Sequence, residues 1–441
     1  MEAPVPERLT RELGVFGATM MGLGSIVGTG VFVSIGVAAG ATGPSIGLAI
    51  ALAAVVATCN ALSSAQLAAS HAVSGGTYEY GYRYLSPWLG FTAGWTFLCA
   101  KTASAATAAL GLSGYLLRVL GVDLRWQVIV ALAAVVGFTL LVLGGVKRSS
   151  RVNIIIVTAT LGSLSLFILF GLPDLAANGR ANLAPIFPSA DGDGLSGFFY
   201  ATALMFVAYT GYGRVATLGE EVKNPRSAIP RAIVITLGVS AALYVLVAMT
   251  AIGAIGVERF AGAAESAATP LEAAARAFAT PGLPEIVAVG AVTAMLGVLL
   301  NLILGLSRVV LAMGRQGDLP PLFGRLNSHG SSPSAAVVGV GLAVAGLTVT
   351  GSVETTWAFS AFTVLIYYAV TNLAALRLPK EDRLYPRAFA VGGLAACLFL
   401  AFWVPLPIWL FGLGLIFLGL MWHLLARRVW ATKATSTSRV P

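Results

Sequence analysis

The feature that most constrains this chain is its first long run of uncharged, mostly apolar residues, from Val15 to Gly40. A helix needs about 20 such residues to cross the ~30 Å hydrocarbon core of a bilayer, and the run is too long for a signal-peptide apolar region. Eleven further runs follow closely, at roughly 44–70, 90–117, 126–146, 153–173, 196–218, 232–256, 284–313, 335–350, 355–376, 388–404 and 406–426. The sequence therefore predicts an all-α polytopic membrane protein with twelve transmembrane helices in a lipid bilayer.

The charged residues indicate how these helices lie across the membrane. Charged residues make up 10% of the chain and the formal net charge is +9, but the basic residues are scattered over short loops, unlike those of a nucleic-acid-binding protein. With a cytoplasmic N-terminus, nineteen of the 27 lysine and arginine residues fall on the cytoplasmic side, as the positive-inside rule requires. The five that fall outside are Arg118, Arg125, Arg180, Arg259 and Arg276. We therefore expect a plasma (inner) membrane protein with both termini cytoplasmic, and no nucleic acid among its partners.

The connections between the runs are short. None is longer than about thirty residues, which leaves no room for a separate catalytic module. The expected organisation is a cytoplasmic N-terminus at 1–14, a first five-helix set at 15–173, an extracytoplasmic loop at 174–195, a second five-helix set at 196–376, helices 11 and 12 at 388–426, and a cytoplasmic tail at 427–441.

Residues that could support other chemistry are sparse. The three cysteines fall inside predicted spans and are expected to be free thiols: Cys59, Cys99 and Cys397. The three histidines lie in or near cytoplasmic loops and far apart in sequence, so we expect no metal site: His71, His329 and His423. The predicted spans hold no paired acids, Ser–His arrangement or histidine cluster, and we therefore expect neither an enzyme nor a cofactor.

Glycine is concentrated in two of the runs. The first run has four glycines in the nine residues from Gly22 to Gly30, although each glycine inside a helix costs up to ~1 kcal/mol relative to alanine. The sixth run has a similar centre, Tyr209-Thr-Gly-Tyr-Gly-Arg214. One interpretation is close helix packing through small residues, and the other is a pair of helices broken around a transport site. The positions favour the second, because these runs are the first members of two successive sets of five.

Motifs in and between these two runs carry a family resemblance. The first run contains Gly24-Ser-Ile-Val-Gly-Thr-Gly-Val-Phe32, and the sixth contains Phe206-Val-Ala-Tyr-Thr-Gly-Tyr-Gly213, followed by Glu220-Glu-Val-Lys-Asn-Pro225. Other motifs recur in order: Ser74-Gly-Gly-Thr-Tyr78, Ser113-Gly-Tyr115, Arg151-Val-Asn153, Ser307-Arg308 and Met313-Gly-Arg-Gln-Gly-Asp-Leu-Pro320. With them the chain strongly resembles permeases of the amino acid–polyamine–organocation (APC) superfamily. The resemblance implies two inverted five-helix repeats with broken helices 1 and 6, peripheral helices 11 and 12, and an α-amino acid or related amine as substrate.

The resemblance also implies how the substrate is held. A half-helix that restarts after a break presents free N–H groups and its positive dipole end, which suit a carboxylate. The matching donors are Gly28, Thr29, with its hydroxyl as a further donor, and Gly30. Carbonyl groups where the preceding half-helices end accept the ammonium, and the matching positions are Ser25, Ile26, Val207, Ala208 and Thr210.

Selectivity is expected to depend on Gly213 and Arg214. Cationic-substrate relatives carry an acid at the position of Gly213, and here Arg214 follows it. A guanidinium in mid-span costs at least ~2.5–3.5 kcal/mol, so it should face the interior. There it contacts substrate or a gate, or else pairs with Glu220 or Glu221. The sequence favours neutral or acidic substrates over cationic ones.

Two residues, Lys101 and Thr160, bear on the coupling ion. Lys101 lies within a predicted span and could carry a coupling proton when desolvated, although it could also reach the membrane surface. Proton-coupled relatives have a lysine at the position of Thr160, whose hydroxyl would instead suit sodium.

The expected function is secondary active transport of amino acids by alternating access, with H⁺ the favoured coupling ion and Na⁺ the alternative. The other candidates are an exchanger of amino acids or amines and a non-transporting amino acid sensor. A channel is disfavoured because no run repeats the charged or carbonyl-ring features of a selectivity filter. The sequence does not indicate an oligomeric state.

Overall fold

The structure is a computed structural model that describes residues 14–71, 76–144, 150–186, 193–216, 222–326 and 333–437. Its helices overlap the predicted runs, although α7 continues about nine residues into the expected loop at 174–195: α1, η1 and α2 (Val15–Ile26, Gly30–Ser34, Ile35–Thr42), α3 (Ile46–Ser70), α5 (Pro87–Leu120), α6 (Gln127–Leu143), α7 (Ser150–Asn182), α8, η4 and α9 (Asp193–Tyr209, Thr210–Tyr212, Gly213–Ala216), α10 (Pro225–Ile255), α13 (Leu283–Arg315), α14 (Ser334–Thr348), α15 (Val353–Leu376), α16 (Arg387–Ala401) and α17 (Leu406–Thr437). The connections carry α4 (Thr77–Tyr84), α11 (Val257–Ala267), α12 (Pro270–Ala277) and the short turns η2 (Gly43–Ser45), η3 (Leu124–Trp126), η5 (Pro321–Gly324) and η6 (Lys380–Asp382).

Several of these helices are long and apolar enough to cross a membrane. Eight segments of the described residues meet both conditions, and three shorter apolar helices, α1, α14 and α16, accompany them. One of the eight, Gly30–Ser70, is two helices in space, because Gly43 has a positive φ of 67° and turns the chain between α2 and α3. The prediction of an α-helical, multi-pass membrane protein agrees with this fold, whereas the number of crossings and the inverted repeat stay predictions.

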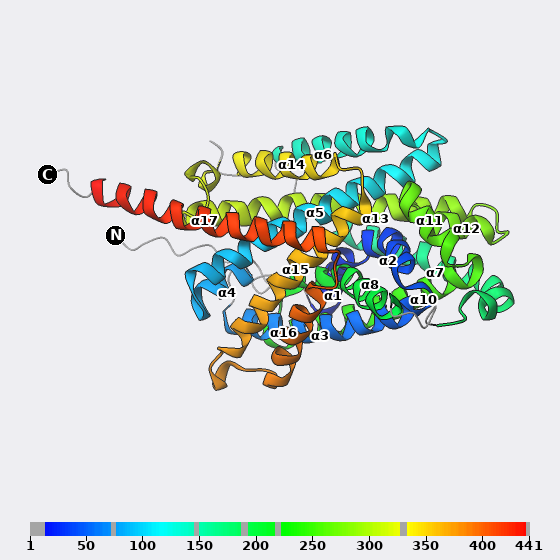
Figure 1. Ribbon diagram of the computed structural model, residues 1–441, viewed down its shortest axis with the longest axis horizontal. Coiled ribbons are helices and arrows are strands. Elements are labelled where there is room, and N and C mark those ends of the chain that lie inside the picture. Colours follow the sequence, from blue (N-terminus) through cyan, green and yellow to red (C-terminus); the bar gives the residue numbers. More distant parts are fainter. Residues whose placement is uncertain are drawn as a thin grey trace.

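The long helices run side by side and give the molecule two ends (Figure 1). One end carries α4, and the last turns of α17 project beyond it; we call this the α4 end. The opposite end carries α11 and α12 and is called the α11 end. These connecting helices pack against the bundle, α4 on α5 and α15 and α11 on α2.

The core of the bundle is built around α5, which packs against α13 and α15. Small residues allow close approach: a Cβ at Gly111 of α5 would lie 2.7 Å from Met295 Sδ of α13, and one at Gly114 would overlap the Ala267 carbonyl of α11. Apolar side chains on outer helices point away from the core, with Leu342 of α14 69% exposed and Phe417 of α17 63% exposed. Exposed apolar side chains in this number fit a lipid environment rather than water.

Candidate functional site

The first predicted span is interrupted in the structure. Helix α1 ends at Ile26, and Val27 has extended backbone with φ −77° and ψ 103°. The chain then re-enters helix as a π-helical turn, η1, in which the Gly28 carbonyl accepts the N–H groups of Val31 and Phe32. The first N–H groups of a restarting helix have no partner within it. Gly28, Thr29 and Gly30, the predicted carboxylate donors, are therefore at the start of the second segment.

The sixth predicted span changes more gently than expected. After Tyr209 the α8 helix tightens into the 3-10 turn η4 and continues as α9, so its backbone does not open into an extended segment. Gly211 explains the crossing of the two spans, because a Cβ at this residue would overlap the carbonyl of Ser25. The two interrupted spans therefore touch backbone to backbone.

A tyrosine from α10 bridges the two interrupted spans. The Tyr244 hydroxyl donates to the Ile26 carbonyl at 2.7 Å and lies 3.5 Å from the Ala208 carbonyl. Tyr244 is completely buried. A buried tyrosine hydroxyl needs a partner, and here the partners are two carbonyls that the sequence assigned to the substrate ammonium.

Two of the three remaining predicted carbonyls, those of Val207 and Thr210, also have hydroxyl neighbours, whereas the Ser25 carbonyl lies against Gly211. The Val207 carbonyl accepts from Thr210 Oγ1 at 2.7 Å, and the Thr210 carbonyl accepts from the Tyr368 hydroxyl of α15 at 3.3 Å. A carbonyl oxygen has two lone pairs. An ammonium would therefore share these oxygens with hydroxyl donors or displace them, which the sequence did not indicate.

The Thr29 side chain is placed as a donor would need to be. It is 3% exposed, and its hydroxyl has no hydrogen-bond partner in the described part of the chain. An unpaired buried hydroxyl costs free energy unless a partner arrives. The Thr29 hydroxyl is therefore available to a carboxylate.

Lys101 of α5 reaches the sixth span. Its Nζ donates to Thr210 Oγ1 at 2.7 Å, across 109 residues of sequence. The ammonium is directed to the 3-10 turn and not to the membrane surface, so this geometry favours the interior interpretation of the two left open by the sequence. Ser104, one helical turn on, pairs with Ser360 of α15 at 2.8 Å instead of with the lysine.

The glycines of the first span are packed tightly. A Cβ at Gly28 would lie 2.6 Å from Val298 Cγ2 of α13, and one at Gly30 would lie 2.5 Å from the Ala208 Cβ. Close packing and an interrupted helix therefore occur together at this site. A large side chain at either glycine would disturb the fold, so such variants cannot separate binding from packing.

The other predicted residues are placed as follows. Gly213 begins α9, and a Cβ there would be 3.4 Å from the Tyr368 hydroxyl. Arg214 is in α9, but its side chain, Glu220 and Glu221 lie outside the described residues. Thr160 is buried in α7, and its hydroxyl donates to the Ile156 carbonyl at 2.8 Å.

One polar cluster was missed entirely by sequence reasoning. His423 was expected near a loop, but it is 3% exposed inside α17, and its Nδ1 lies 2.9 Å from Asp318 Oδ1. Asp318 belongs to the Gly-Asp-Leu-Pro motif, whose acid could have signalled a partner, but nothing in the sequence identifies His423. No cluster that could hold a metal occurs among the described residues.

A cavity of about 350 Å³ is present at the α11 end. Its lining comes from both interrupted spans, through Gly40 of α2 and Tyr200 of α8, and from Glu265, Glu354 and Trp403. The cavity therefore adjoins the segments on the α11 side of the two interruptions.

Comparisons with known proteins identify the family. The protein-family model for amino acid permeases matches residues 17–434. The chain belongs to the amino acid permease family. Its APC resemblance is confirmed, and with several apolar helices the permease is a multi-pass membrane protein.

The relatives of this permease are transporters. An uncharacterized transporter of Mycobacterium tuberculosis is 38% identical over 99% of this chain and 96% of its own. A branched-chain amino acid permease of Bacillus subtilis is 31% identical over 93% of each chain. A methylthioribose transporter of Bacillus subtilis is 27% identical over 87% of this chain and 84% of its own. Of the two relatives named for a substrate here, one is named for branched-chain amino acids and the other for methylthioribose.

Proposed function

We propose that this permease is a secondary active transporter that carries neutral amino acids by alternating access, with a proton as the coupling ion. The observation that carries the proposal is the crossing of two interrupted spans, with Lys101 directed at it from α5. Enzymatic activity is not part of the proposal, since neither the family nor the site suggests it. We place the protein in the plasma (inner) membrane with the α4 end cytoplasmic.

The first step is recognition of the amino acid backbone. The N-terminal end of the restarting helix in span one offers partial positive charge to a carboxylate, and the Thr29 hydroxyl adds a buried donor that has no partner among the residues the structure describes. The ammonium approaches the carbonyls around Ile26 and Ala208. There it would compete with the Tyr244 hydroxyl, so substrate binding and the bridge between the spans are coupled.

The second step is selection of the side chain. Large aromatic side chains surround the crossing, and Phe206 packs edge-on against Tyr368 with ring centroids 5.6 Å apart. No ion pair within the described residues includes Lys101. An uncompensated cation near the path repels a cationic substrate, by ~2 kcal/mol at ~8 Å and an effective dielectric constant of ~20. Neutral side chains are thus favoured over those of arginine and lysine, and the full-length similarity to a branched-chain permease agrees.

The third step is coupling. A lysine amine can release its proton in an apolar setting, unlike an arginine guanidinium. Loss of the proton leaves the nitrogen able to accept from Thr210 Oγ1, whose single hydroxyl proton would then leave the Val207 carbonyl to which it now donates. That change alters the hydrogen bonds of the 3-10 turn of span six, where the substrate carbonyls lie.

The test is uptake of radiolabelled leucine into proteoliposomes in sodium-free buffer, with the outside made acidic. We expect an inward proton gradient to accelerate uptake, and isoleucine but not arginine to compete. In Lys101→Met, exchange of leucine across the membrane should persist while acceleration by the gradient is lost. The matched control is Thr160→Val, which should keep proton drive. Uptake that strictly requires sodium and is abolished by Thr160→Val would show that sodium, not the proton, is the coupling ion. Stronger competition by glutamate or arginine than by isoleucine would overturn the substrate class.

A further inference from the structure

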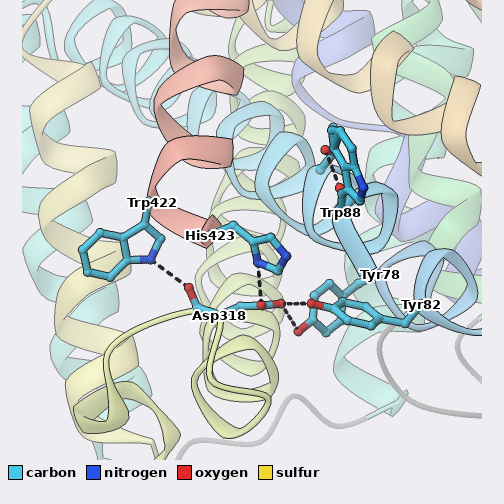
Figure 2. A network of polar contacts seen from close by, with 7 residues as sticks. Tyr78, Tyr82, Trp88, Asp318, Trp422 and His423 are labelled. Atoms are coloured by element: carbon cyan, nitrogen blue, oxygen red, sulfur yellow. Dashed lines mark hydrogen bonds and ion pairs between the residues drawn. The ribbon is translucent and has the colours of Figure 1, made fainter. Parts of the chain in front are cut away.

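A buried carboxylate at the α4 end gathers side chains from distant parts of the sequence. Asp318 follows α13 and is 2% exposed, and its Oδ2 accepts from the hydroxyls of Tyr78 at 2.6 Å and Tyr82 at 2.7 Å. Its other oxygen lies 2.9 Å from His423 Nδ1, and its backbone carbonyl accepts from Trp422 Nε1 at 2.8 Å. Figure 2 shows Asp318 at the centre of these four side chains.

The arrangement satisfies a carboxylate that would be costly to bury alone. An unpaired buried charge is strongly disfavoured, whereas two hydroxyl donors on one oxygen, with the His423 ring nitrogen close to the other oxygen, offset the desolvation of the carboxylate. Burial, with Asp318 adding to it, holds the pKa values of both Tyr78 and Tyr82 above their ordinary range, so both hydroxyls keep their protons and donate. The His423 ring also stacks on Phe91 of α5 with centroids 4.5 Å apart. The carboxylate therefore fixes α4 against both α13 and α17.

The opposite face of α4 contacts α15. The Thr77 hydroxyl lies 2.7 Å from Thr371 Oγ1, and Tyr80 packs with the buried Ala374 and Ala375. One turn before Thr371 in α15, the Tyr368 hydroxyl donates to the Thr210 carbonyl in the span-six turn. Helix α4 thus has Asp318 on one side and, on the other, the helix that contacts the substrate crossing.

We propose that Asp318 is a positioning residue for transport, which clamps α4 against α15 and thereby sets the geometry of the span-six turn at Thr210. When the carboxylate loses its donors, α4 is free to move away from α15, and Tyr368 loses its fixed position. The turn then interconverts between conformations without the restraint that the wild-type clamp supplies. The transport measurement that tests this proposal rests on the proposed function, whereas the hydrogen–deuterium exchange measurement does not.

The first experiment is hydrogen–deuterium exchange of the purified full-length permease in nanodiscs. Asp318→Asn keeps the side-chain volume and removes the charge, Tyr78→Phe removes one donor, and Thr371→Val removes the link on the opposite face. We expect all three to speed exchange in peptides spanning 204–216, by about three- to tenfold. Tyr84→Phe is the matched control, because its hydroxyl contacts Ser70 at 3.2 Å and not Asp318, and it should leave these peptides unchanged.

The second experiment separates positioning from simple structural support. Turnover per reconstituted molecule should change about three- to tenfold in Asp318→Asn while the leucine KM stays near wild type, and Asp318→Asn combined with Thr371→Val should match the stronger single variant. If Asp318→Asn does not give a monodisperse protein, Tyr78→Phe and Tyr82→Phe carry the same comparison. Faster exchange confined to 76–85, with 204–216 as in wild type, would overturn the proposal, and so would additive effects in the double variant. Absence of leucine transport with the expected exchange pattern would instead count against the proposed function alone.

Discussion

The bridge made by Tyr244 yields a prediction whose magnitude follows from the geometry. Tyr244→Phe removes the hydroxyl that donates to the Ile26 carbonyl at 2.7 Å, and the 3.5 Å contact with Ala208 is too long to add much. Hydrogen bonds between membrane helices contribute ~0.6 kcal/mol on average and up to ~1.7 kcal/mol, and a buried carbonyl left without a partner adds a penalty. A loss of about 1–2 kcal/mol is therefore expected, which corresponds to about a 5- to 30-fold shift in an equilibrium that depends on the bridge.

The assay is thermal unfolding of the purified protein together with leucine uptake. Without substrate, Tyr244→Phe should lower Tm by about 1–2 °C. Leucine should restore more stability to Tyr244→Phe than to wild type, because the substrate ammonium can take the vacated carbonyl. Tyr209→Phe is the matched control, since its ring packs against that of Tyr244 at 5.3 Å but, among the described residues, its hydroxyl makes only a long 3.4 Å contact with the Ile50 carbonyl. Equal effects of the two variants, or no extra stabilisation by leucine in Tyr244→Phe, would refute the reasoning.

Two further predictions concern the Thr29 hydroxyl and the packing of α5. Thr29→Val should leave Tm unchanged or slightly higher, because the buried hydroxyl has no partner in the described ranges of the chain. It should nevertheless raise the leucine KM about tenfold through loss of a donor to the carboxylate, as measured by uptake kinetics. An unchanged KM would remove Thr29 from the site. Gly114→Ala should destabilise by about 1–3 kcal/mol in thermal unfolding, because its Cβ would overlap the Ala267 carbonyl. Gly262→Ala, in α11 with nothing within 4 Å of the added Cβ, is the control and should stabilise by about 0.4–1 kcal/mol; the reverse order would contradict the packing argument.

The comparison of sequence and structure is most informative at the two interruptions. Glycine density in the first span predicted a break, and the backbone leaves the helix at Val27. The same reasoning predicted an unwound sixth span, but the chain adopts a 3-10 turn there instead. Glycine lowers the cost of leaving a helix without prescribing the alternative. Contact between Gly211 and the Ser25 carbonyl selects the tighter turn, and that contact belongs to the packed bundle.

The sequence alone determined the properties that depend on local composition. Apolar runs identify the helices because each must satisfy its backbone hydrogen bonds internally in lipid, and the ordered motifs identified the family. These properties need no knowledge of which helices are neighbours. The positions of Gly28, Thr29 and Gly30 at a helix restart follow for the same reason.

Only the tertiary structure decided which side chains reach these positions. The partners are far apart in sequence: Lys101 and Thr210 by 109 residues, Tyr244 and Ile26 by 218, and Tyr78 and Asp318 by 240. Whether a polar side chain in a helix faces lipid, a neighbour or a carbonyl depends on the rotation and crossing of packed helices. Hydropathy depends on residue type and does not distinguish these orientations. The hydroxyl partners of the predicted carbonyls and the contacts of Asp318 are therefore defined only by the packed bundle.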